Sequence, residues 1–138
     1  MTRAVLVHAL PDALAALEAA GGAEVLLASA AGAAGYAGAG WWVELAALAR
    51  AAHPGSRAVF LLDCAESAGD ALGALRVGVT EIAFRGTAAQ AAAVARITAA
   101  SGARILPYPA ETLDLRGRKD AVAACRRWLS SDMPHLPA

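Results

Sequence analysis

The stretch of the chain most suggestive of chemistry is the glycine-rich segment GYAGAGWW, residues 35–42. Gly35, Gly38 and Gly40 free the backbone to turn several N–H groups toward one point. A helix beginning at Trp41 would add the positive end of its dipole, and the two features together would bind an anion. The simpler interpretation is a flexible connector, because the whole chain is rich in alanine and glycine.

Proton transfer has three candidate residues, His8, Asp63 and Glu66, because imidazole and carboxylate groups are common acids and bases in enzymes. The chain contains no HxxH or HExxH spacing, so we expect no metal site. Arg85 and Thr87 are candidates for binding instead. A guanidinium beside a capped helix start pairs well with a bound anion.

The elements that must position these residues are predicted from short apolar runs bounded by turn residues. The runs are continuous rather than alternating, which is typical of parallel strands buried on both faces. They are AVLVHAL (4–10), EVLLAS (24–29), AVFLLDC (58–64), EIAF (81–84) and RILPY (104–108).

Helical segments fill the gaps between these runs, at 11–22, 41–55, 67–78, 87–102 and 118–131. Strands that alternate with helices favour a parallel sheet with right-handed crossovers. We therefore predict an α/β fold over residues 1–130, an open five-stranded sheet with helices on both faces. Its flavodoxin-like strand order would be 2-1-3-4-5. Residues 109–119 are predicted to be a connector, and residues 131–138 a frayed tail.

In such a sheet, ligands bind at the carboxyl ends of the strands. The residues predicted there include all the candidates above: His8, Ser29, Asp63, Cys64, Glu66, Arg85, Thr87 and Tyr108. The glycine segment belongs to an unusually long loop at the same edge, residues 30–40, and long loops are enriched in function.

A (βα)5 chain of this length whose third strand ends in Asp63 resembles a response-regulator receiver domain. The resemblance implies that Asp63 stands at the phosphate-accepting position and Thr87 near the switch hydroxyl. Two family features are replaced here. Val7-His8-Ala9-Leu10 stands where the family has its acidic pair for Mg²⁺, and Leu106-Pro107-Tyr108 where it has a lysine.

Trp41 and Trp42 are neighbours on a predicted helix and point about 100° apart, so both cannot face one groove of the sheet. One interpretation places one ring in the core and leaves the other half-exposed. The other places both at an interface between copies of the chain, since tryptophan is enriched at interfaces. We favour the interface and expect a homo-oligomer.

Bulk composition excludes several classes of function. Twelve basic residues balance twelve acidic ones, so no global charge attracts nucleic acid or a membrane surface. The two cysteines are far apart, no apolar run reaches transmembrane length, and we expect a cytoplasmic protein. Lys119 is the only lysine and precedes the last helix, which argues against Schiff-base chemistry. A P-loop and a dinucleotide fingerprint are absent, and we expect no cofactor.

Three functional hypotheses follow from the sequence. The first is a non-catalytic protein that binds a small anion through Gly35, Gly38, Gly40, Arg85 and Thr87. The second is a small enzyme that uses His8 with Asp63 or Glu66. The third is the degenerate receiver-like signalling module.

Overall fold

Six parallel strands form one sheet in the computed structural model of the chain, which describes residues 3–131. In chain order they are β1 (Arg3–Leu6), β2 (Glu24–Ala28), β3 (Arg57–Asp63), β4 (Glu81–Ala83), β5 (Arg104–Ile105) and β6 (Glu111–Asp114). Across the sheet they lie in the order β5-β4-β3-β2-β1-β6. The parallel α/β class predicted from the sequence is confirmed.

The helices lie between and after these strands. They are α1 (Leu10–Ala20), α2 (Ala33–Tyr36), α3 (Ala39–Ala52), α4 (Ala68–Arg76), α5 (Ala88–Ala100) and α6 (Ala121–Ser131). Local sequence explains several of their ends. Ser67 caps α4 by accepting a hydrogen bond from Asp70 N, and a capping box joins Thr87 to Gln90 at α5. Gly21 ends α1 with a positive φ.

The predicted order 2-1-3-4-5 is wrong, because the chain adds β1 to β5 consecutively in one direction. Right-handed crossovers that all advance the same way place their helices on the same face of the sheet. One large core cluster accordingly contains residues from α1, α3, α4, α5 and α6 together with one face of the sheet. Helices on both faces would have required the order to reverse, so that prediction is also corrected.

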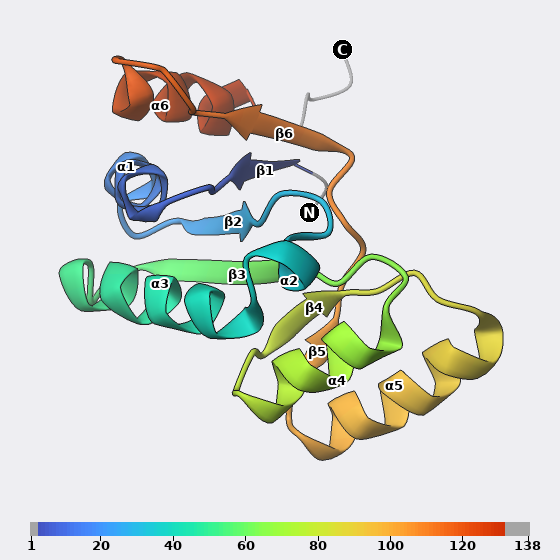
Figure 1. Cartoon of the computed structure of the whole chain (residues 1–138). Helices are drawn as coiled ribbons and strands as arrows, with labels where there is room; N and C mark the ends of the chain where they lie inside the picture. The colour runs from blue at the N-terminus through green and yellow to red at the C-terminus, as the bar shows by residue number, and fades with distance from the viewer. Residues whose placement is uncertain (1–2, 132–138) are drawn as a thin grey trace, which may run out of the picture.

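The sixth strand, β6, lies within the segment predicted to be a connector, 109–119. It pairs in parallel with β1, and Arg3 Nε contacts Glu111 Oε1 at 2.8 Å. The strand is short, lies at the sheet edge and carries mostly exposed polar residues, so it shows no buried apolar run. Figure 1 shows the segment after β5 running back along the sheet to reach β6 at the opposite edge.

That returning segment covers the face of the sheet on which no helix of the described residues packs. Leu106 and Tyr108 pack there against a second apolar cluster. The cluster consists of small and medium side chains from four strands: Ala4, Leu26, Ala28, Leu61 and Ala83. The two faces are therefore closed in different ways, one by helices and one by an extended segment of chain.

Among the described residues, no helix combines the length and the apolar character needed to cross a membrane. The predicted tail, 131–138, lies outside the described residues except for Ser131, the last residue of α6.

Candidate functional site

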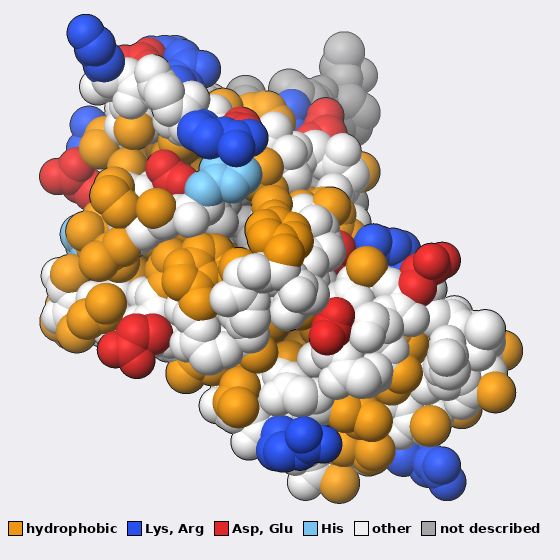
Figure 2. Space-filling model, in the orientation of Figure 1, with side chains coloured by type: hydrophobic (Ala, Val, Ile, Leu, Met, Phe, Trp, Pro, Cys, Tyr) orange, Lys and Arg blue, Asp and Glu red, His pale blue; other side chains and the backbone are white. Residues whose placement is uncertain are grey.

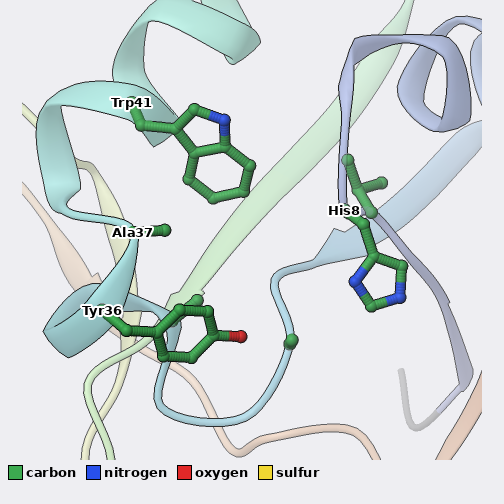
Figure 3. A pocket seen from close by; sticks show the side chains of 7 residues that line it. His8, Tyr36, Ala37 and Trp41 are labelled. Atoms are coloured by element: carbon green, nitrogen blue, oxygen red, sulfur yellow. The ribbon is translucent and has the colours of Figure 1, made fainter.

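A pocket of about 230 Å³ opens at the carboxyl ends of β1 and β2, where the sequence predicted a site. His8, from the turn after β1, stands on one side (Figure 3), and Tyr36, Ala37 and Trp41 stand on the other. The remaining walls are apolar: Val7, Ala30 and Ala33. Figure 2 shows hydrophobic side chains gathered near the middle of the face that Figure 1 presents.

Two glycines with positive φ shape the far wall of this pocket. Gly32, with φ of 71°, precedes the short helix α2, and Gly38, with φ of 89°, separates α2 from α3. Both angles lie in the region that side chains disfavour, so glycine is the natural residue at each. The two bends place Tyr36, at the end of α2, and Trp41, in the first turn of α3, beside the same space.

The His8 ring is held from the side of the neighbouring strand β6. Its Nε2 atom lies 3.1 Å from Asp114 Oδ1, and its backbone N–H donates to Asp12 Oδ2 at 2.9 Å. Asp114 is held in turn by Arg116, whose backbone N–H donates to Oδ1 at 2.9 Å. This backbone hydrogen bond lowers the pKa of Asp114, and the interactions with His8 and with the Arg116 side chain lower it further, against an opposing effect of desolvation.

A second polar cluster forms around Asp63, whose side chain is fully buried at the end of β3. Its Oδ1 atom accepts a hydrogen bond from Arg85 Nη1 at 3.0 Å. Its Oδ2 atom accepts one from Gly32 N at 2.7 Å and a longer one from Arg85 Nη2 at 3.4 Å. The hydrogen bond and the charge of Asp63 raise the pKa of Arg85.

Ser29 and Tyr108 complete the surroundings of this ion pair. The backbone N–H of Asp63 donates to Ser29 Oγ at 2.9 Å, and Tyr108 donates its hydroxyl to Ser29 O at 2.7 Å. Burial, reinforced by the charge of Asp63, raises the pKa of Tyr108 to about 12, so its hydroxyl remains a donor. Asp63 thus connects the ends of β3 and β4 with the loop after β2.

The predicted site residues do not all come together. Arg85 pairs with Asp63, whereas Thr87 is used in capping α5: its Oγ1 accepts from Gln90 N, and its N–H donates to Gln90 Oε1. Glu66 is exposed. His8 pairs with Asp114 on β6 rather than with Asp63.

The predicted loop at 30–40 is partly helical, and some of its N–H groups are used locally. Gly35 N donates to Gly32 O and Gly38 N to Ala33 O. Gly40 lies in the first turn of α3, which begins at Ala39 and not at Trp41. The segment is therefore partly helical, and the amides of Gly35 and Gly38 are paired within it.

The two tryptophans occupy different environments. Trp42 is 1% exposed and meets Phe60 edge to face at 5.9 Å between ring centroids, so it offers no surface to a second chain. Trp41 is partly exposed and lines the pocket. Of the two tryptophans predicted at an interface, only Trp41 therefore presents surface that a second chain could contact.

The sequence indicated His8 but missed Asp114, its partner in the structure, and Tyr36, which lines the same pocket. Asp114 was assigned to a connector, and Tyr36 is one aromatic residue inside a glycine-rich stretch. Neither carries a local signal, because pairing with β6 and the bends at Gly32 and Gly38 bring them to the site. In the described part of the chain, no three His, Cys, Asp or Glu side chains gather in an arrangement that could hold a metal ion.

Comparison of the chain with protein-family models and with curated proteins gives no match. The site must therefore be interpreted from its own chemistry.

Proposed function

We propose that this protein binds a small anionic ligand with an apolar body in the pocket between His8, Tyr36 and Trp41. The observation that carries this proposal is the composition of the pocket. Polar hydrogen-bonding groups from three different elements surround a space whose other walls are alanine and valine. A few convergent polar groups in an otherwise apolar pocket are typical of small-molecule sites.

Two features favour a negative charge on the ligand. The imidazole of His8 donates from both nitrogens when protonated. The start of α3 is the second feature: its N-cap is Gly38, which supplies no side-chain cap, and Trp41 stands in that first turn. The first N–H groups of a helix have no partner within the helix and carry partial positive charge. A carboxylate on the ligand can accept hydrogen bonds from both the His8 imidazole and these N–H groups.

The apolar lining of the pocket indicates that the body of the ligand is apolar. Val7, Ala30, Ala33 and Ala37 offer no hydrogen bonds from their side chains, and the rings of Tyr36 and Trp41 present large flat surfaces. A planar hydrocarbon group attached to a carboxylate therefore matches the pocket better than a fully polar anion. This proposal keeps the glycine segment at the site and assigns Arg85 and Thr87 to the protein's internal interactions.

Tryptophan fluorescence measures such binding, because Trp41 lines the pocket. We expect benzoate to quench the emission saturably and benzyl alcohol, its neutral counterpart, to bind at least about tenfold more weakly, as loss of a charged hydrogen bond implies. The substitution His8→Ala should weaken the binding of benzoate by a similar factor. His53→Ala is the matched control, because His53 follows α3 and lies outside this pocket.

Equal affinity for benzoate and benzyl alcohol would overturn the assignment of an anion site. Absence of saturable binding by either would overturn the pocket itself as the binding site for this class of ligand. Trp41→Phe identifies which of the tryptophans reports the signal.

A further inference from the structure

We propose that the same pocket transfers protons, with His8 as the base and Tyr36 as the facing acid, on a carbonyl compound bound there. This inference rests on the proposed binding function and goes beyond it. It stands on the hydrogen bond between His8 and Asp114 and on the orientation of His8 and Tyr36 across one cavity.

The contact with Asp114 determines which nitrogen of the neutral ring carries the proton. An ionised carboxylate only accepts hydrogen bonds, so Nε2 must be the donor in the 3.1 Å contact with Asp114 Oδ1. Asp114 is kept ionised by the backbone N–H and the guanidinium of Arg116, which lower its pKa. Neutral His8 therefore carries its lone pair on the other nitrogen, Nδ1. In this form His8 does not donate to the ligand, so the carboxylate of the substrate accepts from the N–H groups at the start of α3, and Nδ1 faces the carbon next to the carbonyl group. Carboxylates orient catalytic histidines by the same logic in hydrolytic triads.

The free nitrogen is directed at the ligand space. In Figure 3 one ring nitrogen of His8 points across the pocket toward Tyr36, and the Tyr36 hydroxyl points back toward His8. The two groups come from different elements, the turn after β1 and the end of α2. A base and a hydroxyl donor on opposite sides of one ligand are the two groups that enolisation of a carbonyl compound requires.

The step balances without any oxidant or cofactor. Nδ1 of His8 takes a proton from the carbon next to the carbonyl group, and the electron pair of that C–H bond becomes a C=C bond. The carbonyl π electrons move to oxygen, which takes the proton of the Tyr36 hydroxyl. Tyr36 is 71% exposed and regains a proton from water. Reversal of these steps returns the ketone. A 2-oxo carboxylate with an apolar side chain combines the reacting carbonyl group with the carboxylate and the apolar body proposed above, and it is therefore the substrate class.

Phenylpyruvate is a suitable probe, because it combines a carboxylate, an aromatic body and exchangeable protons beside its carbonyl group. Proton NMR in D₂O follows loss of those protons, and tryptophan fluorescence follows binding on the same sample. We expect the full-length protein to speed exchange and His8→Gln to reduce the rate by about 100-fold or more. His53→Gln, outside the pocket, should leave the rate unchanged.

The two measurements separate this inference from the binding proposal. Saturable binding with exchange no faster than in protein-free buffer would overturn proton transfer and leave the binding function standing. Absence of binding would overturn both. If His8→Gln fails to fold, as judged by circular dichroism, Tyr36→Phe tests the same mechanism at an exposed residue and should lower the rate without loss of binding.

Asp114 has a positioning role in this scheme, since it acts on the substrate only through His8. Asp114→Asn no longer dictates the tautomer, because an amide both donates and accepts. We expect a lower exchange rate at saturating phenylpyruvate with little change in affinity. A change in affinity alone would assign Asp114 a structural role and contradict this part of the proposal.

Discussion

The carboxylate of Asp63 and the guanidinium of Arg85 form a two-point ion pair that joins the carboxyl ends of β3 and β4, with N–O distances of 3.0 and 3.4 Å. The pair is asymmetric, because the Asp63 side chain is fully buried whereas that of Arg85 is 51% exposed. The same carboxylate accepts the N–H of Gly32. Arg85, which was predicted to bind an external anion at this edge, thus binds, together with the amide of Gly32, an anion that the protein itself supplies.

Removal of Arg85 should be costly, because a buried carboxylate loses its cation. We expect Arg85→Ala to lower the free energy of unfolding by about 2–3 kcal/mol, since water reaches part of the vacated position and moderates the full cost of a broken buried pair. Urea denaturation measures this change. Arg76→Ala, at an exposed position in the last turn of α4, is the control and should change it by less than about 0.5 kcal/mol. Equal effects of the two substitutions would contradict a stabilising role of the pair.

Ala65 has a φ of 50°, the one positive value among the described non-glycine residues, and its carbonyl accepts the N–H of Arg85 at 2.8 Å. The left-handed conformation costs alanine about 1–2 kcal/mol. We expect Ala65→Gly to raise the free energy of unfolding by about 0.5 kcal/mol, after the greater freedom of glycine in the unfolded chain is subtracted. Ala95→Gly, at an exposed position inside α5, should instead lower it by about 1 kcal/mol. Thermal or urea unfolding of the two variants should give changes of opposite sign in the free energy of unfolding. Changes of the same sign would refute the strain at Ala65.

The buried thiol of Cys64 should be unreactive in the folded protein. Burial, followed by the charges of Asp63 and Asp70, raises its pKa from 9.0 to about 12. Only the thiolate is a good nucleophile, so iodoacetamide at about pH 8 should modify the unfolded chain far faster than the folded one. Intact mass spectrometry, with and without urea, measures both rates, and equally fast modification of Cys64 would disprove its burial.

The same raised pKa has a consequence for alkaline stability. Above pH 9 the unfolded chain begins to release the Cys64 proton, while the folded protein keeps it until about pH 12. The unfolded state is then favoured increasingly, so the stability present below pH 9 declines as the pH rises through this window. Cys64→Ala should show a shallower decline over the same range.

Thr87 should matter for stability rather than for ligand binding. Thr87→Ala removes the side-chain acceptor of Gln90 N and should lower the free energy of unfolding by about 1 kcal/mol. Thr87→Ser retains the hydroxyl and should therefore keep most of the wild-type free energy of unfolding. Benzoate affinity should be the same in all three proteins. A loss of affinity in Thr87→Ala would return Thr87 to the binding site.

Self-association of the chain stays a prediction, and the structure changes where it should be tested. Leu48 is 50% exposed and lies seven residues after Trp41, so the two residues share one side of α3. We expect native mass spectrometry to detect an oligomer of the wild-type chain and a monomer of Leu48→Glu. Ala47→Glu, also exposed on α3 but one residue away around the helix, is the control. A monomeric wild-type protein would refute the prediction.

The sequence determined the features that depend on neighbouring residues. Apolar runs between turn residues predicted the alternation of strands and helices, and the helical segment predicted from residue 87 begins at the observed N-cap of α5, Thr87. Asp63 ends β3 as expected, and His8 lies two residues after β1, which ends at Leu6 and not at residue 10 as predicted. These signals are local, since burial of a strand and capping of a helix are decided within a few residues.

Tertiary structure alone decided the strand order, the sixth strand and the partners of the candidate residues. Asp63 and Arg85 are 22 residues apart, and His8 and Asp114 are 106 apart. The segment 111–114 becomes a strand because it pairs with β1, not because it carries an apolar run of its own. No local pattern encodes which strand lies beside which. That choice depends on the direction in which successive crossovers advance, and it placed His8 next to Asp114 instead of Asp63.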